Sequence, residues 1–172
     1  MSPWLELSRA AVADVKAVLA QMPTREERER VVGRGKGGDD TAALDEAAEA
    51  ATLKHFERED VRIVSEEIGF RGNGRFTVVV DPIDGSQNAE RGIPYFCLCI
   101  AVAEGDTVDD VFFGYVYDFG ANEEWYAVRG GEALVVAAKR RRQLPEKRTE
   151  LRRAHERIDP VEQKGEVLCG VP

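Results

Sequence analysis

At Asp60 the hydrophobic pattern of the sequence changes from helical to strand-like, and this change limits the fold more than any other feature. Before it, residues 4–20 form an amphipathic pattern in which one stripe carries Leu5, Val12, Val15 and Leu19. An Ala-rich segment of high helix propensity follows; we expect Asp40 or Thr41 to cap it and the helix to run to about Glu57. Helices followed by a run of strands predict an α+β fold.

Five segments after residue 60 have the composition of strands, with turn residues between them. They are residues 61–64, 76–80, 96–102, 111–117 and 124–128. The second segment runs directly into Asp81-Pro82, and because proline cannot donate to a β-ladder we expect strand pairing to end there. The charged run at residues 25–30 predicts a solvated helix end or a loop.

Composition and charge exclude several classes of protein. The chain has 172 residues and a net charge of −8, which suits one globular domain and argues against a general nucleic-acid binder. No apolar run approaches the roughly 20 residues that a membrane-spanning helix needs. The N-terminus lacks the basic and apolar regions of a signal peptide. We therefore expect a cytoplasmic protein with neither nucleic acid nor membrane as a partner.

The three cysteines show no disulfide framework. Cys97 and Cys99 are two residues apart on a predicted strand, so their side chains should point to the same face, and Cys169 lies near the C-terminus. An odd number of cysteines without framework spacing favours reduced thiols. A C-x-C pair can bind a metal, but without a second Cys/His pair we favour small buried apolar side chains.

Acidic residues follow the helix and strand signals at three places, where loops commonly build sites. They are Asp45 in the second helix, Ser65-Glu66-Glu67 after the first strand, and Asp81-Pro82-Ile83-Asp84-Gly85-Ser86 after the second. Asp81 and Asp84 lie three apart across a proline-containing turn, so both can converge on one point with the Ile83 carbonyl between them. Such an oxygen-only ligand set suits a hard cation such as Mg²⁺.

The residues after Asp84 can also open a short helix. The free backbone N–H groups of a helix start attract phosphate oxygens, so one hexapeptide offers carboxylates to a metal and amides to a phosphate. An alternative stays open, in which Asp81 and Asp84 only form an Asx turn and a helix cap.

These motifs resemble those of the inositol monophosphatase superfamily. Residues 81–86 resemble its D-P-[IL]-D-G-[ST] signature, Ser65-Glu66-Glu67 resembles its Gly/Ser-Glu-Glu metal motif, and residues 39–49 are similar to the helix that bears its aspartate. Residues 61–105 are similar to the archaeal members, which combine inositol monophosphatase and fructose-1,6-bisphosphatase activity. The resemblance covers about residues 5–131. It implies the sugar phosphatase fold, an α+β layered sandwich with an antiparallel sheet packed on two N-terminal helices.

The resemblance further implies roles for individual residues. The metal ligands would be Glu66, Asp81, the Ile83 carbonyl and Asp84. The catalytic residues would be Asp45, Ser86 and Glu67. Asp45 and Ser86 would orient the attacking water, and Glu67 would lie close behind Glu66, which would touch a third, weaker ion. The N–H groups of Gly85 and Ser86 would hold the phosphate. Most relatives carry Thr where Ser86 stands, and Ser keeps the hydroxyl without the methyl that fixes its rotamer.

The implied reaction is hydrolysis of a small sugar or inositol phosphate, with two or three Mg²⁺ ions as cofactors and Mn²⁺ as an alternative. The resemblance also implies that complete relatives form homodimers. Two other functions remain open. One is a 3′-phosphoadenosine-type nucleotidase of the same superfamily, and the other is a catalytically dead fragment that binds metal or a partner subunit.

The segment after residue 131 departs from the family pattern. Residues 132–172 contain 10 Lys+Arg against 7 Asp+Glu, and the W-D-x-A-A-G-like segment that relatives use to complete the second metal site is missing. We expect residues 1–131 to form the metal- and phosphate-binding domain, and residues 132–172 to be an atypical basic tail, disordered or frame-shifted. Without the second half of the family fold, we expect an apolar face around Phe96, Leu98 and Ile100 to meet water, and very low activity.

Three further polar residues stand alone in the sequence. His55 and His155 have no nearby ligand partners, so we expect exposed or hydrogen-bonded histidines rather than metal ligands. Lys36, in the Gly-rich segment 33–38, can reach a phosphate or can simply be solvated, and both readings stay open.

Overall fold

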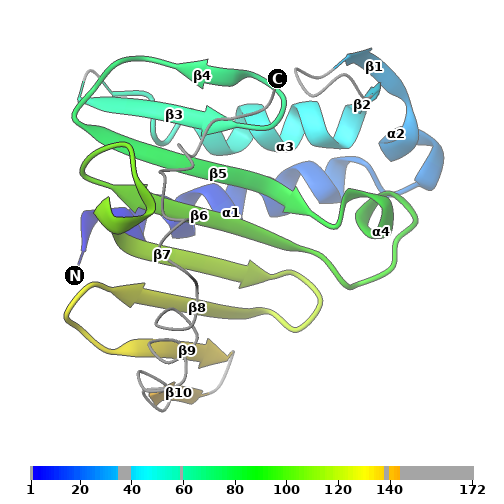
Figure 1. Cartoon of the computed structure of the whole chain (residues 1–172). Helices are drawn as coiled ribbons and strands as arrows, with labels where there is room; N and C mark the ends of the chain where they lie inside the picture. The colour runs from blue at the N-terminus through cyan, green and yellow to red at the C-terminus, as the bar shows by residue number, and fades with distance from the viewer. Residues whose placement is uncertain (1, 35–39, 59, 138–139, 144–172) are drawn as a thin grey trace, which may run out of the picture.

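The computed structural model describes residues 2–34, 40–58, 60–137 and 140–143. Its main feature is one eight-stranded sheet in the order β10-β9-β8-β7-β6-β5-β3-β4, with α1 and α3 packed together on one face (Figure 1). The helices are α1 Pro3–Gln21, α2 Arg25–Glu29, α3 Ala43–Leu53, α4 Ser86–Glu90 and the 3₁₀ turn η1 Val108–Asp110. The strands of this sheet are β3 Val61–Ser65, β4 Gly69–Arg71, β5 Phe76–Asp84, β6 Cys97–Ala103, β7 Val111–Asp118, β8 Glu123–Val128, β9 Ala133–Ala137 and β10 Arg140–Gln143.

The two long helices bury one face each against the sheet. In α1 the buried residues recur every three or four positions, as a single apolar stripe requires. They are Trp4, Leu5, Ser8, Ala11, Val12 and Val15. A proline in its first turn suits a helix start, because the missing N–H has no intrahelical acceptor there. The predicted N-terminal helix and the α+β class are therefore confirmed. None of the helices within the described ranges is long and apolar enough to cross a membrane.

The region before α3 differs from the prediction. Asp40 and Thr41 do not cap the helix, because Asp40–Ala42 forms β2, which pairs antiparallel with β1 at Val31–Arg34. The N-cap is Ala42, without a side-chain hydrogen bond, and the helix ends at Leu53 rather than near Glu57. The charged run at residues 25–30 contains the short helix α2, which a capping box between Thr24 and Glu27 starts.

The sheet has one hydrophobic face under the helices and an opposite face, here called the open face, on which none of the described helices α1, α2 and α3 packs. Val78, Val80, Leu98, Ile100 and Val102 alternate along β5 and β6 and are buried in the core. Leu98 and Ile100, expected to meet water, are 0% and 3% exposed because they belong to the same hydrophobic core as the buried residues of α1 and α3. The open face instead carries the alternate residues, and a hollow of about 420 Å³ is lined on it by Val79, Ala101, Gly114, Val116, Trp125 and Ala127 among others.

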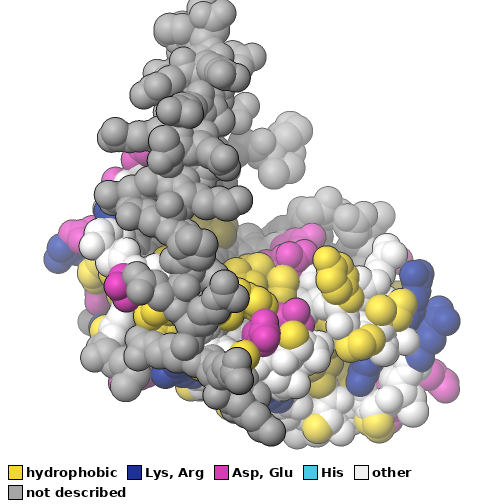
Figure 2. Space-filling view, turned by 90° about the horizontal axis from the view of Figure 1, so that it is seen from below, with side chains coloured by type: hydrophobic (Ala, Val, Ile, Leu, Met, Phe, Trp, Pro, Cys, Tyr) yellow, Lys and Arg dark blue, Asp and Glu magenta, His cyan; other side chains and the backbone are white. Residues whose placement is uncertain are grey.

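Figure 2, a view from the β9–β10 side, shows hydrophobic side chains gathered in the middle of the molecule with acidic side chains among them. β9 and β10 lie beyond residue 131 and continue the sheet by antiparallel pairing to β8 and to each other. The sheet thus runs past the position where we divided the chain, and the division itself stays a prediction. Residues 144–172 of the predicted tail lie outside the described residues.

Pairing along β5 continues past Pro82, contrary to the prediction. Asp81 pairs with Cys99 and Asp84 pairs with Cys97. Between these two pairs β5 therefore advances three positions while β6 advances two. This one-residue excess is a β-bulge, a place where a sheet tolerates proline because the ladder is already interrupted.

β3 and β5 pair in parallel, whereas all other pairs in the described sheet are antiparallel. The return from β4 to β5 passes close to the start of β3. A Cβ atom on Gly74 would lie only 2.1 Å from the carbonyl carbon of Asp60, so only glycine fits there. Phe76 N–H then donates to the Asp60 carbonyl at 3.0 Å and starts β5 beside β3.

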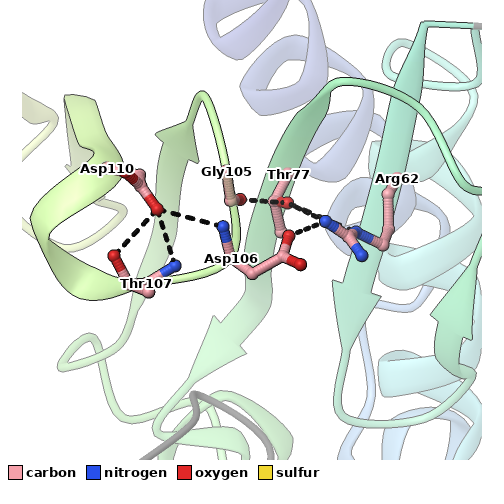
Figure 3. A network of polar contacts seen from close by, with 6 residues as sticks. All are labelled: Arg62, Thr77, Gly105, Asp106, Thr107 and Asp110. Carbon is pink, nitrogen blue, oxygen red and sulfur yellow. Dashed lines mark hydrogen bonds and ion pairs between the residues drawn. The ribbon is translucent and has the colours of Figure 1, made fainter. Parts of the chain in front are cut away.

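A polar network fixes the opposite end of these strands (Figure 3). The Thr77 hydroxyl donates to the Gly105 carbonyl at 2.6 Å and accepts from Arg62, which also forms an ion pair with Asp106. The Asp110 carboxylate accepts hydrogen bonds from the N–H groups of Asp106 and Thr107. These bonds hold the β6–β7 loop against β3 and β5, far from the end where the acidic motifs lie.

An ion pair that the sequence analysis missed joins α1 to the sheet. Glu124 on β8 is 7% exposed and accepts two hydrogen bonds from Arg9 Nε, at 3.1 and 3.0 Å, and one from the Tyr115 hydroxyl at 3.0 Å. Removing the cation from a buried carboxylate is costly, because the remaining charge loses its partner.

Arg9→Met should therefore lower the free energy of unfolding by about 2 kcal/mol, less than for a fully buried pair because Arg9 is partly exposed and Tyr115 still donates. Arg25→Met is the matched control, because Arg25 pairs with Glu29 on the surface of α2. Urea denaturation of both variants tests this, and equal stabilities would contradict a structural role for the Arg9–Glu124 pair.

Candidate metal and phosphate site

The parallel pairing of β3 with β5 brings two acidic motifs together. Ser65 at the end of β3 lies beside Val80 on β5, so the residues that follow each strand leave the sheet at the same edge. Glu66 and Glu67 therefore come next to Asp81, although Glu67 and Asp81 are 14 positions apart in the chain.

The bulge in β5 decides where Asp84 points. Side chains alternate between the two faces of a strand, so residues three apart normally lie on opposite faces. Because the bulge inserts one extra residue between them, Asp81 and Asp84 instead point to the same face of the sheet. This is the face to which Cys99 and Cys97, their partners on β6, also point. The two aspartates are close enough that Asp84 raises the pKa of Asp81.

Helix α3 adds two further carboxylates. Asp45 and Glu49 are four residues apart and so share one helix face, which points at the ends of β3 and β5. The resulting acidic pocket has a volume of about 20 Å³, enough for roughly one water molecule or ion. Its lining residues are Asp45, Glu49, Glu66, Glu67, Asp81, Pro82, Ile83 and Ser86.

Burial and like charges raise the pKa of two of these carboxyl groups. Burial is the larger cause at Asp45, where Glu90, Glu67 and Glu66 add repulsion and the Ser86 side chain opposes it, and the pKa is raised to about 6. Burial, then Asp84 and Glu66, raise the pKa of Asp81 to about 6, against a hydrogen bond from the Ile83 N–H. Burial and repulsion thus disfavour the charged forms of Asp45 and Asp81, and a cation bound between the carboxylates would remove this penalty.

One oxygen of Asp45 has no protein partner. Asp45 Oδ1 is buried and accepts no hydrogen bond from any residue in the described part of the chain. The Ser86 hydroxyl donates to the Ile83 carbonyl, with 3.0 Å between the two oxygens, and the Ser86 side chain also lowers the pKa of Asp45. A buried acceptor without a donor marks a place where water or a cation belongs.

The turn at Gly85 starts α4 directly after Asp84. Gly85 has φ of 96°, and a Cβ there would lie 3.2 Å from the Tyr95 carbonyl oxygen, so glycine suits this position on both counts. The predicted short helix is confirmed as Ser86–Glu90. Of the alternative reading, the Asx turn is present, since Ile83 N–H donates to Asp81 Oδ1 at 3.2 Å, but the helix cap is not, because the N-cap of α4 is Gly85 without a side-chain hydrogen bond. This local turn and a metal site are compatible, because a carboxylate has further lone pairs.

Sequence reasoning missed Glu49 and Thr41. Glu49 is 4% exposed and accepts hydrogen bonds from the Ser65 hydroxyl and the Ile68 N–H, so it holds the turn that presents Glu66 and Glu67. The Thr41 hydroxyl donates to Glu67. The spacing of four residues from Asp45 was a usable signal for Glu49, whereas nothing local pointed to Thr41.

The structure brings Asp45, Glu66, Glu67, Asp81, Ile83 and Ser86 into the one acidic pocket. Asp84 and Gly85 line an adjacent hollow of about 210 Å³, together with Asn88, Tyr95, Phe96, Cys97 and Asp118. Whether these residues act as assigned stays a prediction.

The remaining polar residues of the sequence analysis divide into two groups. His55 Nε2 lies 2.5 Å from Asp14 Oδ2, which confirms a hydrogen-bonded histidine rather than a metal ligand. Lys36, His155 and Cys169 lie outside the described residues. Cys97 and Cys99 share one face as predicted, but they are half-buried rather than fully buried.

The ligand set suits a hard divalent cation. Every side-chain donor in the acidic pocket is an oxygen, and the Ile83 carbonyl adds another. Carboxylate and carbonyl oxygens are the ligands of Mg²⁺ and Mn²⁺, and the crowding that raises the pKa of Asp45 and Asp81 would be relieved by such an ion.

Known proteins are similar to this chain in sequence and in fold. A dual fructose-1,6-bisphosphatase/inositol-1-monophosphatase of Archaeoglobus fulgidus is 41% identical over 138 residues, covering 77% of this chain and 54% of the relative. A protein with the same description from Methanocaldococcus jannaschii is 32% identical over 133 residues, or 77% of this chain and 52% of the relative. The chain thus spans about half the length of these curated relatives.

A solved structure described as an inositol monophosphatase-fructose 1,6 bisphosphatase matches with a TM-score of 0.69 and 33% identity, over 78% of this chain and 52% of that one. Residues 1–165 match the sequence pattern of the inositol monophosphatase family, further than the motifs alone had indicated. The sequence, the fold and the arrangement of the three motifs agree, and the chain belongs to the inositol monophosphatase family.

Proposed function

We propose that this chain carries the metal- and phosphate-binding part of a Mg²⁺-dependent phosphatase that hydrolyses a sugar or inositol phosphomonoester. One observation carries the proposal: carboxylates from α3, from the turn after β3 and from β5 converge on a small oxygen-lined pocket beside the start of α4. The relatives named above are phosphatases by description, which supports the same class of reaction.

The proposed metal ligands follow from the pocket. Glu66, Asp81 and the Ile83 carbonyl would hold one ion, and Asp81 with Asp84 would hold a second, so that Asp81 bridges the two. Glu66 would also touch a third, weaker ion near Glu67. Bound Mg²⁺ lowers the pKa of water and neutralises charge on phosphoryl oxygens.

The protein groups supply position and a proton acceptor. Asp45 and the Ser86 hydroxyl would orient the attacking water, because the Ser86 hydroxyl, which donates to the Ile83 carbonyl, is also close enough to Asp45 to lower its pKa. A carboxylate whose pKa is raised toward neutrality is a better proton acceptor than an ordinary one. The backbone N–H groups of Gly85 and Ser86 would hold the phosphate, since the first N–H groups of a helix have no intrahelical acceptor.

The proposed substrates are small phosphomonoesters. Inositol-1-phosphate and fructose-1,6-bisphosphate are the leading candidates, because the relatives are described as acting on them. The 210 Å³ hollow beside Asp84 would lie next to a phosphate held at Gly85. A cytoplasmic location would suit the free thiols of Cys97 and Cys99, which need a reducing compartment.

The first test concerns charge crowding in the metal-free protein. The folded pKa values of Asp45 and Asp81 lie near 6, above their values in an unfolded chain. The stability that these groups contribute is therefore present below about pH 4 and is lost as the pH rises through about 6. At pH 7.5 without divalent cations, Asp81→Asn should raise the free energy of unfolding by roughly 1 kcal/mol, after allowing for solvent screening of this half-buried group.

Thermal unfolding with and without Mg²⁺ or Mn²⁺ measures the stability of each variant and its stabilisation by the ions. The ions should raise the melting temperature of the wild type and leave that of Asp81→Asn nearly unchanged. Asp109→Asn, at an exposed position in η1, is the matched control and should respond to the ions as the wild type does. An equal response of the Asp81 variant would remove Asp81 from the proposed metal site.

The second test concerns the reaction. In a form of the protein that releases phosphate from inositol-1-phosphate or fructose-1,6-bisphosphate, Asp45→Asn should lower kcat by about 10² to 10⁴ with little change in KM, the usual effect of losing a proton-transfer group. Glu46→Gln, the next residue on α3 but exposed, is the control and should keep its activity.

A substrate panel separates the candidate functions. Release of phosphate only from a 3′-phosphoadenosine nucleotide would favour the nucleotidase. Metal binding without any phosphate release, even in a form that includes the segments present in complete relatives, would favour a catalytically dead protein. A rise in KM with normal kcat for Asp45→Asn would place Asp45 outside the chemistry.

A further inference from the structure

A second group of metal-ligating atoms lies beside the acidic pocket and differs from it in chemistry. It consists of one carboxylate oxygen of Asp84 and the sulfur atoms of Cys97 and Cys99, all within 4.8 Å of one another. Asp84 is exposed and the cysteines are half-buried, so the group opens to solvent. The 210 Å³ hollow is lined by Asp84 and Cys97 and gives it an approach.

Strand geometry holds these three side chains in place. Cys97 and Cys99 are alternate residues of β6 and point to the same face, and the bulge in β5 sets Asp84 directly opposite Cys97. The Cys97 sulfur lies 3.5 Å from Asp84 Oδ2 and 3.6 Å from the Cys99 sulfur. Asp81, opposite Cys99, adds a neighbouring negative charge that attracts a cation.

Two of the three separations between these atoms fit one tetrahedral ion. With zinc–sulfur bonds of about 2.3 Å and a zinc–oxygen bond of about 2.1 Å, a tetrahedron has edges of about 3.8 Å between two sulfurs and about 3.6 Å between sulfur and oxygen. The Cys97–Cys99 and Cys97–Asp84 separations of 3.6 and 3.5 Å are close to these edges, and the remaining pair, the Asp84 oxygen and the Cys99 sulfur, lies within 4.8 Å.

A disulfide fits this pair less well. Two alternate residues of one strand have Cα atoms about 6.6 Å apart, near the upper limit for a disulfide of about 6.8 Å. The sulfurs would have to approach to about 2.05 Å, whereas an ion bridges them near their present separation.

We propose that Asp84, Cys97 and Cys99 form a site for a thiophilic divalent cation such as Zn²⁺, with three protein ligands and a fourth position open to solvent. Zn²⁺ accepts cysteine and carboxylate ligands together, whereas Mg²⁺ avoids thiolates. The site is thus distinct in ion preference from the oxygen-lined pocket, although Asp84 belongs to both ligand sets. The proposal does not depend on phosphatase activity.

Co²⁺ is the probe, because tetrahedral cobalt bound to thiolate absorbs visible light and gives a sulfur-to-metal charge-transfer band in the near ultraviolet. Titration of the reduced, metal-free protein with Co²⁺ should produce both signals, and Zn²⁺ should abolish them by displacement. Cys97→Ser and Cys99→Ser should each weaken Co²⁺ binding at least tenfold and reduce the charge-transfer band. Cys169→Ser removes the third thiol of the chain and is the matched control.

Protection from alkylation gives a second measurement that needs no variant. Zn²⁺ should slow the reaction of Cys97 and Cys99 with iodoacetamide, read by mass spectrometry of their shared peptide, and should leave Cys169 unaffected. Failure of Co²⁺ to give a charge-transfer band, or unchanged alkylation in the presence of Zn²⁺, would overturn the proposal. So would a band that survives in the Cys97→Ser/Cys99→Ser double variant. Because neither readout uses Mg²⁺ or a phosphate ester, failure here leaves the proposed phosphatase function untouched.

Discussion

The acidic pocket depends on the parallel pairing of β3 with β5. In an antiparallel pair the residues that follow the two strands would leave at opposite edges of the sheet, and Glu66 would lie far from Asp81. The parallel register places Ser65 beside Val80, so both acidic loops leave at one edge. The return path that makes this pairing possible passes against the start of β3 at Gly74, where no side chain fits.

The bulge at Pro82 adds the second constraint. It brings Asp81 and Asp84 to one face, where burial and mutual repulsion raise the pKa of Asp81. Charge held together in this way destabilises the metal-free fold, and rigid surroundings must maintain it. Those surroundings are hydrogen bonds to Glu49 and Glu67 on the acidic side and the Arg62–Thr77–Gly105 network at the far end of the same strands. The same bulge sets Asp84 against Cys97, so one backbone irregularity places two neighbouring groups of ligands with different ion preferences.

Local patterns in the sequence were enough to predict part of this structure. The stripe from Leu5 to Val15 predicted α1, and β-branched runs predicted the central strands within a few residues. The three acidic motifs identified most of the pocket lining, because the residue types and their positions after strands carry that information. The family resemblance added the expectation that the three motifs come together in one metal and phosphate site.

Other features depend on contacts between distant segments, and local patterns do not contain them. Nothing near Asp40 indicates that this residue starts β2 and pairs with Arg34 of β1 rather than capping α3. The parallel direction of β5 relative to β3 follows from the path of residues 66–75. The continued pairing of β5 beyond Pro82 follows from its register against β6. The Arg9–Glu124 pair joins residues 115 positions apart and has no sequence signature.

The central claim is that the carboxylates of β3, β5 and α3 form a divalent metal site, and anomalous diffraction from crystals grown with Mn²⁺ tests it most directly. The account predicts an anomalous peak within bonding distance of Glu66, Asp81 and the Ile83 carbonyl oxygen. Well-ordered crystals with Mn²⁺ bound elsewhere, or with water at that position at a high Mn²⁺ concentration, would contradict it.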